Sequence, residues 1–361
     1  MKMGMSIAMI SAGLVGLAGC EATQTAGSAQ AAAAGEPDRE LLAAEAPEAP
    51  RVDWVVQRSA LRERAIALLI EYAASNNAML RGNSLEALSP AGPRLQSPLA
   101  AGLADPNAGV RAIAATLVGR EKVRPLAASV RPLLLDESPL VRASAIYALR
   151  SVDAEVDPTP LGALLLESPD PGVRAHAAFL FGELGDRSAL PLLRQALHDD
   201  VPGATEQQAR LVWLQVAEAM VKLGDRDRLE GIRAALYPAR PEEFEIAVLA
   251  TQILGRLGDR SSMAQLINLS EYTQNGRTVP AELRLAVADA AARMGRKEGW
   301  FIAESYLGDP DPLRRSQAAL VLGQTARESD LVTLEGLLDD PNPLVRSAAA
   351  GSILTITSSR G

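Results

Sequence analysis

The hydrophobic and polar positions of the chain repeat along its length beyond residue 50. The segments ADPNAGVRAIAATLVG, DESPLVRASAIYAL, SPDPGVRAHAAFLFGELGD and DDPNPLVRSAAAGSIL each hold an Asp, often a Pro, then Val-Arg and regularly spaced small residues. Alignment on the arginine gives nine reference positions, usually about 31 residues apart: Arg81, Arg111, Arg142, Arg174, Trp213, Ala247, Arg284, Arg315 and Arg346. A period of this length is typical of solenoid proteins, which stack one small unit many times.

The sequence pattern of each unit predicts a pair of helices. An Asp followed by Pro begins the first helix, because the carboxylate accepts free backbone amides and proline lacks an N–H that is not needed there. Such starts are Asp170-Pro171, Asp311-Pro312 and Asp340-Pro341. Glycine ends the helix, as in Leu184-Gly185-Asp186, and SALPLLRQAL then has Leu at helical spacing.

The composition agrees with an all-helical chain. Aromatic residues make up only 3% of the sequence, which favours closely packed helices over a β-sandwich or barrel. We therefore predict an all-α protein, an α-α superhelix of about nine helical-hairpin repeats over residues 51–361. The segment from Asp53 to Ala74 is expected to cover the first unit as a cap.

The motif D-P-x-x-V-R-x-x-A with a following L-G-D resembles the HEAT-like repeats of phycobilisome lyases and many scaffold proteins. In that family the recurrent Asp and Arg bond between neighbouring repeats as a ladder. The resemblance implies an inter-repeat ladder for four arginines: Arg111, Arg142, Arg174 and Arg346. Because Trp213 and Ala247 depart from the pattern, we expect the ladder to be interrupted there.

The first residues have the layout of a secretory signal peptide: Lys2 precedes an uncharged, mostly apolar stretch. Leu17-Ala18-Gly19-Cys20 resembles the lipobox of bacterial lipoproteins, in which the cysteine is lipidated and becomes the first residue after cleavage. The resemblance implies a signal peptide over residues 1–19 and lipidation at Cys20. An uncleaved helix, or a simple secretory signal with an incidental thiol, is the alternative.

Residues 20–50 are rich in Ala, with Gly, Ser, Gln and Pro, and show no amphipathic period, as expected of a flexible tether. The expected location is the bacterial cell envelope, with a lipid anchor in a membrane and an extracytoplasmic solenoid.

Residues capable of catalysis or metal binding are scarce. The two histidines, His176 and His198, do not have the spacing of a paired metal site, and no phosphate-binding loop or Gly-x-Ser-x-Gly motif is present. The HEAT-like deoxyhypusine hydroxylases hold iron with His-Glu dipeptides, which this chain lacks.

A net charge of -8 disfavours binding to nucleic acid, which needs clustered cations. We expect no enzyme activity, no cofactor, no metal and no nucleic-acid partner.

The inner, concave face remains as the candidate binding surface. Residues five positions after the reference change freely between units, and the candidate partner-binding residues among them are Tyr147, Phe179, Glu218, Gln252 and Asp289. Tyr147 and Phe179 form an apolar patch for a partner, or else pack between repeats.

A second row consists of cations at the ends of the helices: Arg120, Lys222, Arg256 and Arg293. These side chains could bind an acidic partner or lipid headgroups, or simply complement the helix dipoles.

These features together predict a membrane-anchored scaffold for an unidentified protein partner. The alternatives are an accessory or regulatory subunit of an envelope enzyme complex and a lyase-like ligand-binding protein.

Overall fold

The computed structural model describes residues 51–237, 244–271, 273–274 and 277–358. The predicted signal peptide (1–19), Cys20 with its lipobox, and the tether (20–50) lie outside the described residues. No helix in these ranges is both long enough and apolar enough to span a bilayer.

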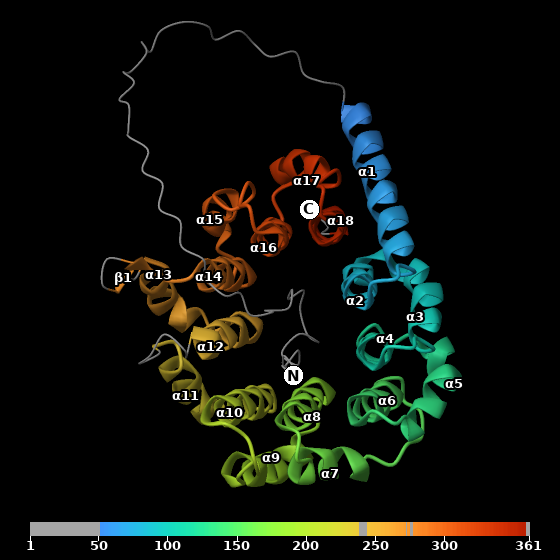
Figure 1. Ribbon diagram of the computed structural model, residues 1–361, viewed down its shortest axis with the longest axis vertical. Coiled ribbons are helices and arrows are strands. Elements are labelled where there is room, and N and C mark those ends of the chain that lie inside the picture. Colours follow the sequence, from blue (N-terminus) through green and yellow to red (C-terminus); the bar gives the residue numbers. More distant parts are fainter. Residues whose placement is uncertain (1–50, 238–243, 272, 275–276, 359–361) are drawn as a thin grey trace, which may run out of the picture.

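The α-helices of the described residues form nine pairs, arranged in an outer and an inner layer (Figure 1). The outer helices are α1 (Arg51–Tyr72), α3 (Gln96–Gly102), α5 (Ala127–Val130), α7 (Thr159–Glu167), α9 (Leu190–His198), α11 (Leu229–Ala234), α13 (Met263–Glu271), α15 (Trp300–Glu304) and α17 (Leu331–Leu337). The inner helices are α2 (Ala78–Ala87), α4 (Ala108–Arg120), α6 (Pro139–Ser151), α8 (Pro171–Leu184), α10 (Glu206–Lys222), α12 (Phe244–Leu257), α14 (Ala281–Arg293), α16 (Pro312–Thr325) and α18 (Pro343–Ser358). The prediction of an all-α superhelix of nine helical hairpins is confirmed.

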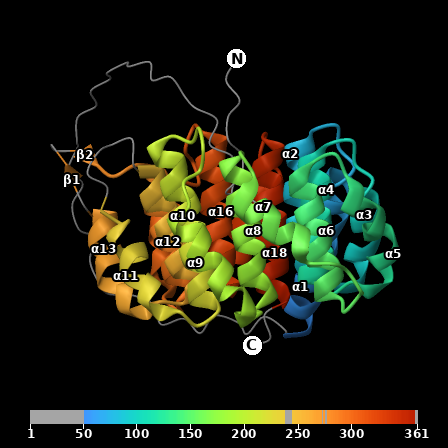
Figure 2. The same cartoon turned by 90° about the horizontal axis from the view of Figure 1, so that it is seen from below.

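One short irregularity interrupts the helices. Strands β1 (Thr273–Gln274) and β2 (Arg277–Thr278) pair antiparallel between α13 and α14, within a longer middle unit. They make the insertion a small hairpin at the edge of the molecule (Figure 2).

The helix ends follow the sequence signals in most units. Asp170 and Asp311 accept hydrogen bonds from the backbone amides of Gly172 and Leu313, and Gly185 adopts a left-handed φ of 71° after α8. The predicted start at Asp340-Pro341 is wrong, because α18 begins at Pro343 and Asn342 accepts the amide of Leu344. Asp340 is thereby free to bond the preceding repeat.

Small residues let the inner helices approach closely. The alanines three positions after the reference, Ala114 and Ala318 among them, are fully buried. A Cβ added to Gly255 would lie 2.8 Å from the Cα of Ala290, and one added to Gly323 would lie 2.8 Å from the Cα of Ser352. Any side chain at these glycines would push the two helices apart.

The solenoid closes on itself, which the sequence did not predict. Helix α18 packs against α16 on one side and against α1 and α2 on the other, so the inner helices form a ring (Figure 1). One continuous hydrophobic core joins Leu69 of α1 to Ile353 of α18. The predicted cap helix α1 therefore belongs to the closing seam.

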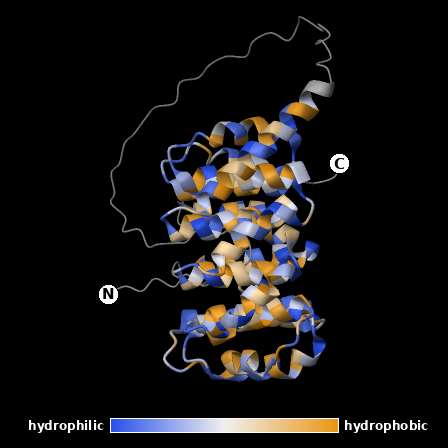
Figure 3. Cartoon of the chain, turned by 90° about the vertical axis from the view of Figure 1, so that its right-hand side faces the viewer, coloured by the Kyte–Doolittle hydropathy of each residue, from blue (hydrophilic) through white to orange (hydrophobic). Residues whose placement is uncertain are grey.

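Polar contacts also cross the closing seam. The Oγ atoms of Ser84 (α2) and Ser347 (α18) are 3.2 Å apart and buried. Arg62 of α1 donates to Ser358 Oγ at 2.6 Å, and Arg64 pairs with Asp339 at 2.8 Å. The first turns of α1 extend beyond the other helices (Figures 1 and 3), and Trp54 and Val55 are exposed there.

Candidate functional site

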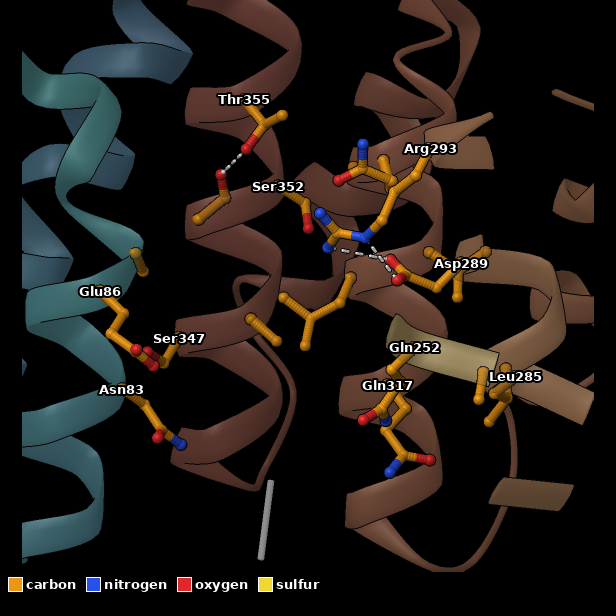
Figure 4. Close-up of a pocket in the computed structure, with 18 of the residues that line it drawn as sticks. Asn83, Glu86, Gln252, Leu285, Asp289, Arg293, Gln317, Ser347, Ser352 and Thr355 are labelled. Carbon is orange, nitrogen blue, oxygen red and sulfur yellow. Dashed lines mark hydrogen bonds and ion pairs between the residues drawn. The ribbon is translucent and has the colours of Figure 1, made fainter. Parts of the chain in front are cut away.

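A cavity of about 360 Å³ lies on the inner side of the ring, between α2, α12, α14, α16 and α18. Many of its lining residues stand five or nine positions after a reference, such as Glu86, Asp289 and Arg293. Of the five candidate partner-binding residues, Gln252 and Asp289 line the cavity. Figure 4 shows Glu86 on one side of the cavity and the Asp289–Arg293 ion pair on the other.

Tyr147 and Phe179 do not form an exposed patch, and that prediction is wrong. Tyr147 is 3% exposed and packs against Gly119 of α4, which has no side chain to occupy that space. Burial raises the pKa of the Tyr147 phenol. Phe179 is 8% exposed, stacks with His176 at 6.4 Å between ring centroids, and lies 5.3 Å from the Lys222 ammonium. Both rings pack between repeats.

Glu218 is also buried, which overturns its assignment as a contact residue. Its carboxylate accepts two hydrogen bonds from Arg256, at 2.8 and 2.7 Å, and Lys222 Nζ lies 2.9 Å away. Lys222 also donates to Glu183 at 2.7 Å, so the network joins α8, α10 and α12. Burial acts to raise the pKa of Glu218, but the opposite charges outweigh it and hold the pKa at about 2.

The four cations of the second row are therefore not available to an acidic partner as free charges. Lys222 and Arg256 pair with Glu218, and Arg293 pairs with Asp289 of its own helix at 2.7 Å. Arg120 bonds Glu121 at 3.1 Å and Ser89 at 2.9 Å.

Glu86, on the cavity side, lacks such a partner. It is half-buried and makes no hydrogen bond or ion pair with any residue that the structure describes. Burial raises its pKa to about 7, and the charge of Arg120 opposes this only in part. Gln317 also lines the cavity, and its buried Oε1 atom has no hydrogen-bond partner among the described residues. Glu86 stands five positions after Arg81, like the candidate residues of the other units, but neither it nor Gln317 carries a sequence signal of its own.

The inter-repeat ladder of Arg–Asp ion pairs is present, but only Arg111 of the four predicted arginines belongs to it. Arg111 makes two hydrogen bonds to Asp136, at 2.8 and 2.9 Å. Equivalent pairs that the sequence analysis did not assign are Arg81–Asp105 and Arg315–Asp340. The signal was in the spacing, since each carboxylate stands 24 or 25 residues after its arginine.

Three of the four predicted ladder arginines lack a carboxylate across the seam. Arg142 donates only to the backbone oxygens of Asp136 and Glu137. Ser168 stands where the next unit would need an Asp, at the position that Asp136 and Asp340 hold in theirs. Arg174 donates to the backbone oxygens of Ser168 and Asp200. Arg346 crosses the closing seam to the Tyr72 hydroxyl. The interruption of the ladder thus begins at Arg142, earlier than expected, and the Arg315–Asp340 pair lies beyond it.

A buried polar chain links three inner helices. Thr116 Oγ1 donates to Ser144 Oγ at 3.1 Å, and Ser144 Oγ lies 2.8 Å from His176 Nε2. Burial lowers the pKa of His176 to about 4, so the ring is neutral at pH 7. His198 lies apart, at the end of α9. Within the part of the chain that the structure describes, no three His, Cys, Asp or Glu side chains are grouped so that they could hold a metal ion.

With this geometry established, comparison with known proteins identifies the repeats. A family model described as HEAT repeats matches residues 156–243 and 277–353. The chain is built from HEAT-like repeats. Repeats of this kind stack into extended surfaces that commonly bind other proteins. No curated protein sequence matches the chain significantly.

Several solved structures are similar to parts of this HEAT-like ring. Human deoxyhypusine hydroxylase in complex with glycerol is 17% identical, with a TM-score of 0.34, over 82% of this chain and 98% of that one. The complex of CpcE and CpcF of phycocyanin lyase from Nostoc sp. PCC7120 is 24% identical, with a TM-score of 0.37, over 54% of this chain and 75% of that one. Kap121p bound to Nup53p is 17% identical, with a TM-score of 0.25, over 85% of this chain and 34% of that one. Likenesses of this size leave the function to be argued from the chain's own residues.

Proposed function

We propose that this protein is a bacterial lipoprotein of the cell envelope whose HEAT-like ring is a scaffold for a protein partner. Two features of the sequence support the proposal: the Leu17-Ala18-Gly19-Cys20 motif and the repeats that follow the tether. Acyl chains on Cys20 would bind the protein to the membrane, because each buried CH₂ contributes roughly 0.8 kcal/mol.

The observation that carries the scaffold proposal is the position of the exposed apolar side chains. Phe301 of α15 and Val332 of α17 are 57% and 71% exposed, and both lie on the outer layer. Tyr147 and Phe179 of the inner layer are buried instead. We therefore place the partner on the outer face of α15 and α17, since apolar side chains free of other contacts supply the core of protein interfaces.

The anchor is tested with Cys20→Ser in native envelopes. The unmodified chain is expected in the membrane fraction, released by detergent and not by salt, and the serine variant is expected in the soluble fraction. Partition of the serine variant into membranes would contradict the lipid anchor.

The partner surface is tested by crosslinking and pull-down from native envelopes. Phe301→Ala with Val332→Ala should lose the partner without lowering the melting temperature, because both side chains are exposed. The matched control is Leu135→Ala, which removes a 90% exposed apolar side chain from the α5–α6 connection. Retention of the same partner by the double variant would exclude this face.

An accessory subunit of an envelope enzyme complex is the second form of the proposal. It requires one obligate partner, which would co-purify in a fixed ratio without crosslinking. A transient scaffold would lose its partners on the same column.

A further inference from the structure

The polar groups around the inner cavity are unevenly satisfied. Arg293 is paired with Asp289, Glu282 with Arg314 at 3.1 Å, and Arg120 with Glu121. The cations that line the cavity, Arg120 and Arg293, are therefore both already in ion pairs. Among the carboxylates that line the cavity, Glu86 alone has no hydrogen bond or ion pair within the described residues.

An ionised carboxylate accepts hydrogen bonds. A half-buried carboxylate without a donor has lost part of its hydration, so a ligand that brings donors recovers that free energy on binding. An anionic ligand would meet no uncommitted cation here, because the arginines already hold carboxylates. A ligand with N–H donors and a positive charge is the complementary one.

Much of the cavity wall is apolar, with polar side chains such as Asn83 and Gln324 among the apolar ones. Leu285, Leu320 and Val321 line it from α14 and α16. A volume of about 360 Å³ is within the range of small-molecule sites, which are mostly apolar with a few placed polar groups. The wall therefore suits a hydrocarbon or aromatic body.

We propose that this cavity binds a small amphiphilic amine, whose protonated nitrogen pairs with the Glu86 carboxylate and whose apolar body packs on the apolar side chains of the wall. This site is independent of the outer surface proposed for the protein partner. A variant that no longer binds the amine should still bind the protein partner, and a variant that loses the partner should still bind the amine.

Binding should strengthen as the pH rises. The charged groups near Glu86 are Arg120 of α4 and, across the cavity, Glu282, Asp289 and Arg293 of α14, while α18 presents Ser347 and Ser352. Glu86 has a pKa of about 7 and ionises between pH 6 and 8, whereas an alkylamine stays protonated throughout. The affinity for the amine is expected to rise about 10-fold over this range.

The test uses calorimetry on the full-length chain with three probes of one shape: phenylethylamine, phenylethanol and phenylacetate. At pH 8 the amine is expected to bind at least about 10-fold more tightly than the alcohol, and the anion least tightly. Equal binding of amine and alcohol, tighter binding of phenylacetate, or no binding of any probe would overturn the proposal.

Matched variants locate the site. Glu86→Gln keeps the shape and should reduce amine affinity to that of the alcohol, with the pH dependence lost. Glu335→Gln removes an exposed carboxylate outside the cavity and should change nothing. Unchanged amine binding by a folded Glu86→Gln protein, checked by its melting curve, would contradict the assignment.

Discussion

Glu86 and Glu218 occupy equivalent positions in their repeats, five residues after the reference, and differ in nearly every property. Glu218 is buried, bonded by Arg256 and Lys222, and has a pKa of about 2. Glu86 faces the cavity without a partner and has a pKa of about 7. The repeat position alone therefore does not determine what a carboxylate does in this ring.

The difference comes from the next helix along the ring. Arg256 of α12 reaches back to Glu218 of α10, across the seam. The equivalent residue for Glu86 is Arg120 of α4, but its guanidinium bonds Glu121 and Ser89. A charged side chain in this solenoid is stabilised by its partner across the seam, and the following predictions test that rule.

The largest effect is expected for Glu218→Gln. Removing the carboxylate leaves Arg256 and Lys222 buried beside a neutral amide, which should cost about 3–5 kcal/mol in the free energy of unfolding. Urea unfolding at pH 7 measures it. The matched control is Glu230→Gln, whose carboxylate pairs with Arg233 but is 79% exposed, and which should cost less than about 1 kcal/mol. Similar losses for both variants would refute the contrast.

The pH dependence of this effect has a definite sign. The pKa of Glu218 lies below its ordinary value of 4.5, so the stabilisation is present above pH 4.5 and is lost as the pH falls towards 2. The difference between wild type and Glu218→Gln should shrink over that window.

Glu86→Gln should change the free energy of unfolding in the opposite direction to Glu218→Gln, and by a smaller amount. The pKa of Glu86 is raised from 4.5 to about 7, so the folded state favours the protonated carboxyl, and stability is lost as the pH rises from 4.5 through 7. The glutamine variant escapes this loss and should be more stable than wild type by roughly 3 kcal/mol at pH 8. At pH 4.5 the two should match. Equal melting temperatures at pH 8 would count against an uncompensated Glu86.

The smallest effect is a gain from Ser168→Asp. The aspartate would stand where Asp136 and Asp340 stand in their units and would give Arg142 a partner across the seam. A two-bond pair at this mostly buried position, where desolvation offsets part of the attraction, should add about 0.5–1 kcal/mol. Chemical unfolding in wild-type and Arg142→Leu backgrounds checks the pairing, since the gain should vanish in the second. A gain of equal size in both backgrounds would show that Arg142 is not the partner.

Local features of the fold were predictable from the sequence. Helix pairs follow from capping Asp, first-turn Pro and terminal Gly, because these signals act within one turn of a helix. Asp340 shows the limit of local reasoning. Its Asp-Pro sequence resembles a helix start, yet its carboxylate bonds Arg315 of the preceding repeat and Asn342 caps α18.

Closure and burial could not be predicted in the same way. Closure depends on the small rotation at each seam, summed over nine repeats, and on α1 fitting against α18. The burial of Tyr147 depends on Gly119 in the neighbouring helix. These are properties of pairs of helices, and no single repeat carries a pattern for them.

The closed ring is the central claim, and one disulfide tests it. Ser84→Cys and Ser347→Cys, in a Cys20→Ser chain, should oxidise to an intramolecular disulfide, because the native Oγ atoms are 3.2 Å apart. The control pair is Thr116→Cys with Ser144→Cys at the α4–α6 seam, where the Oγ atoms are 3.1 Å apart. Rapid oxidation of both pairs, seen as monomers of altered mobility on a non-reducing gel, is the predicted result. Oxidation of the control pair alone would show that the solenoid is open.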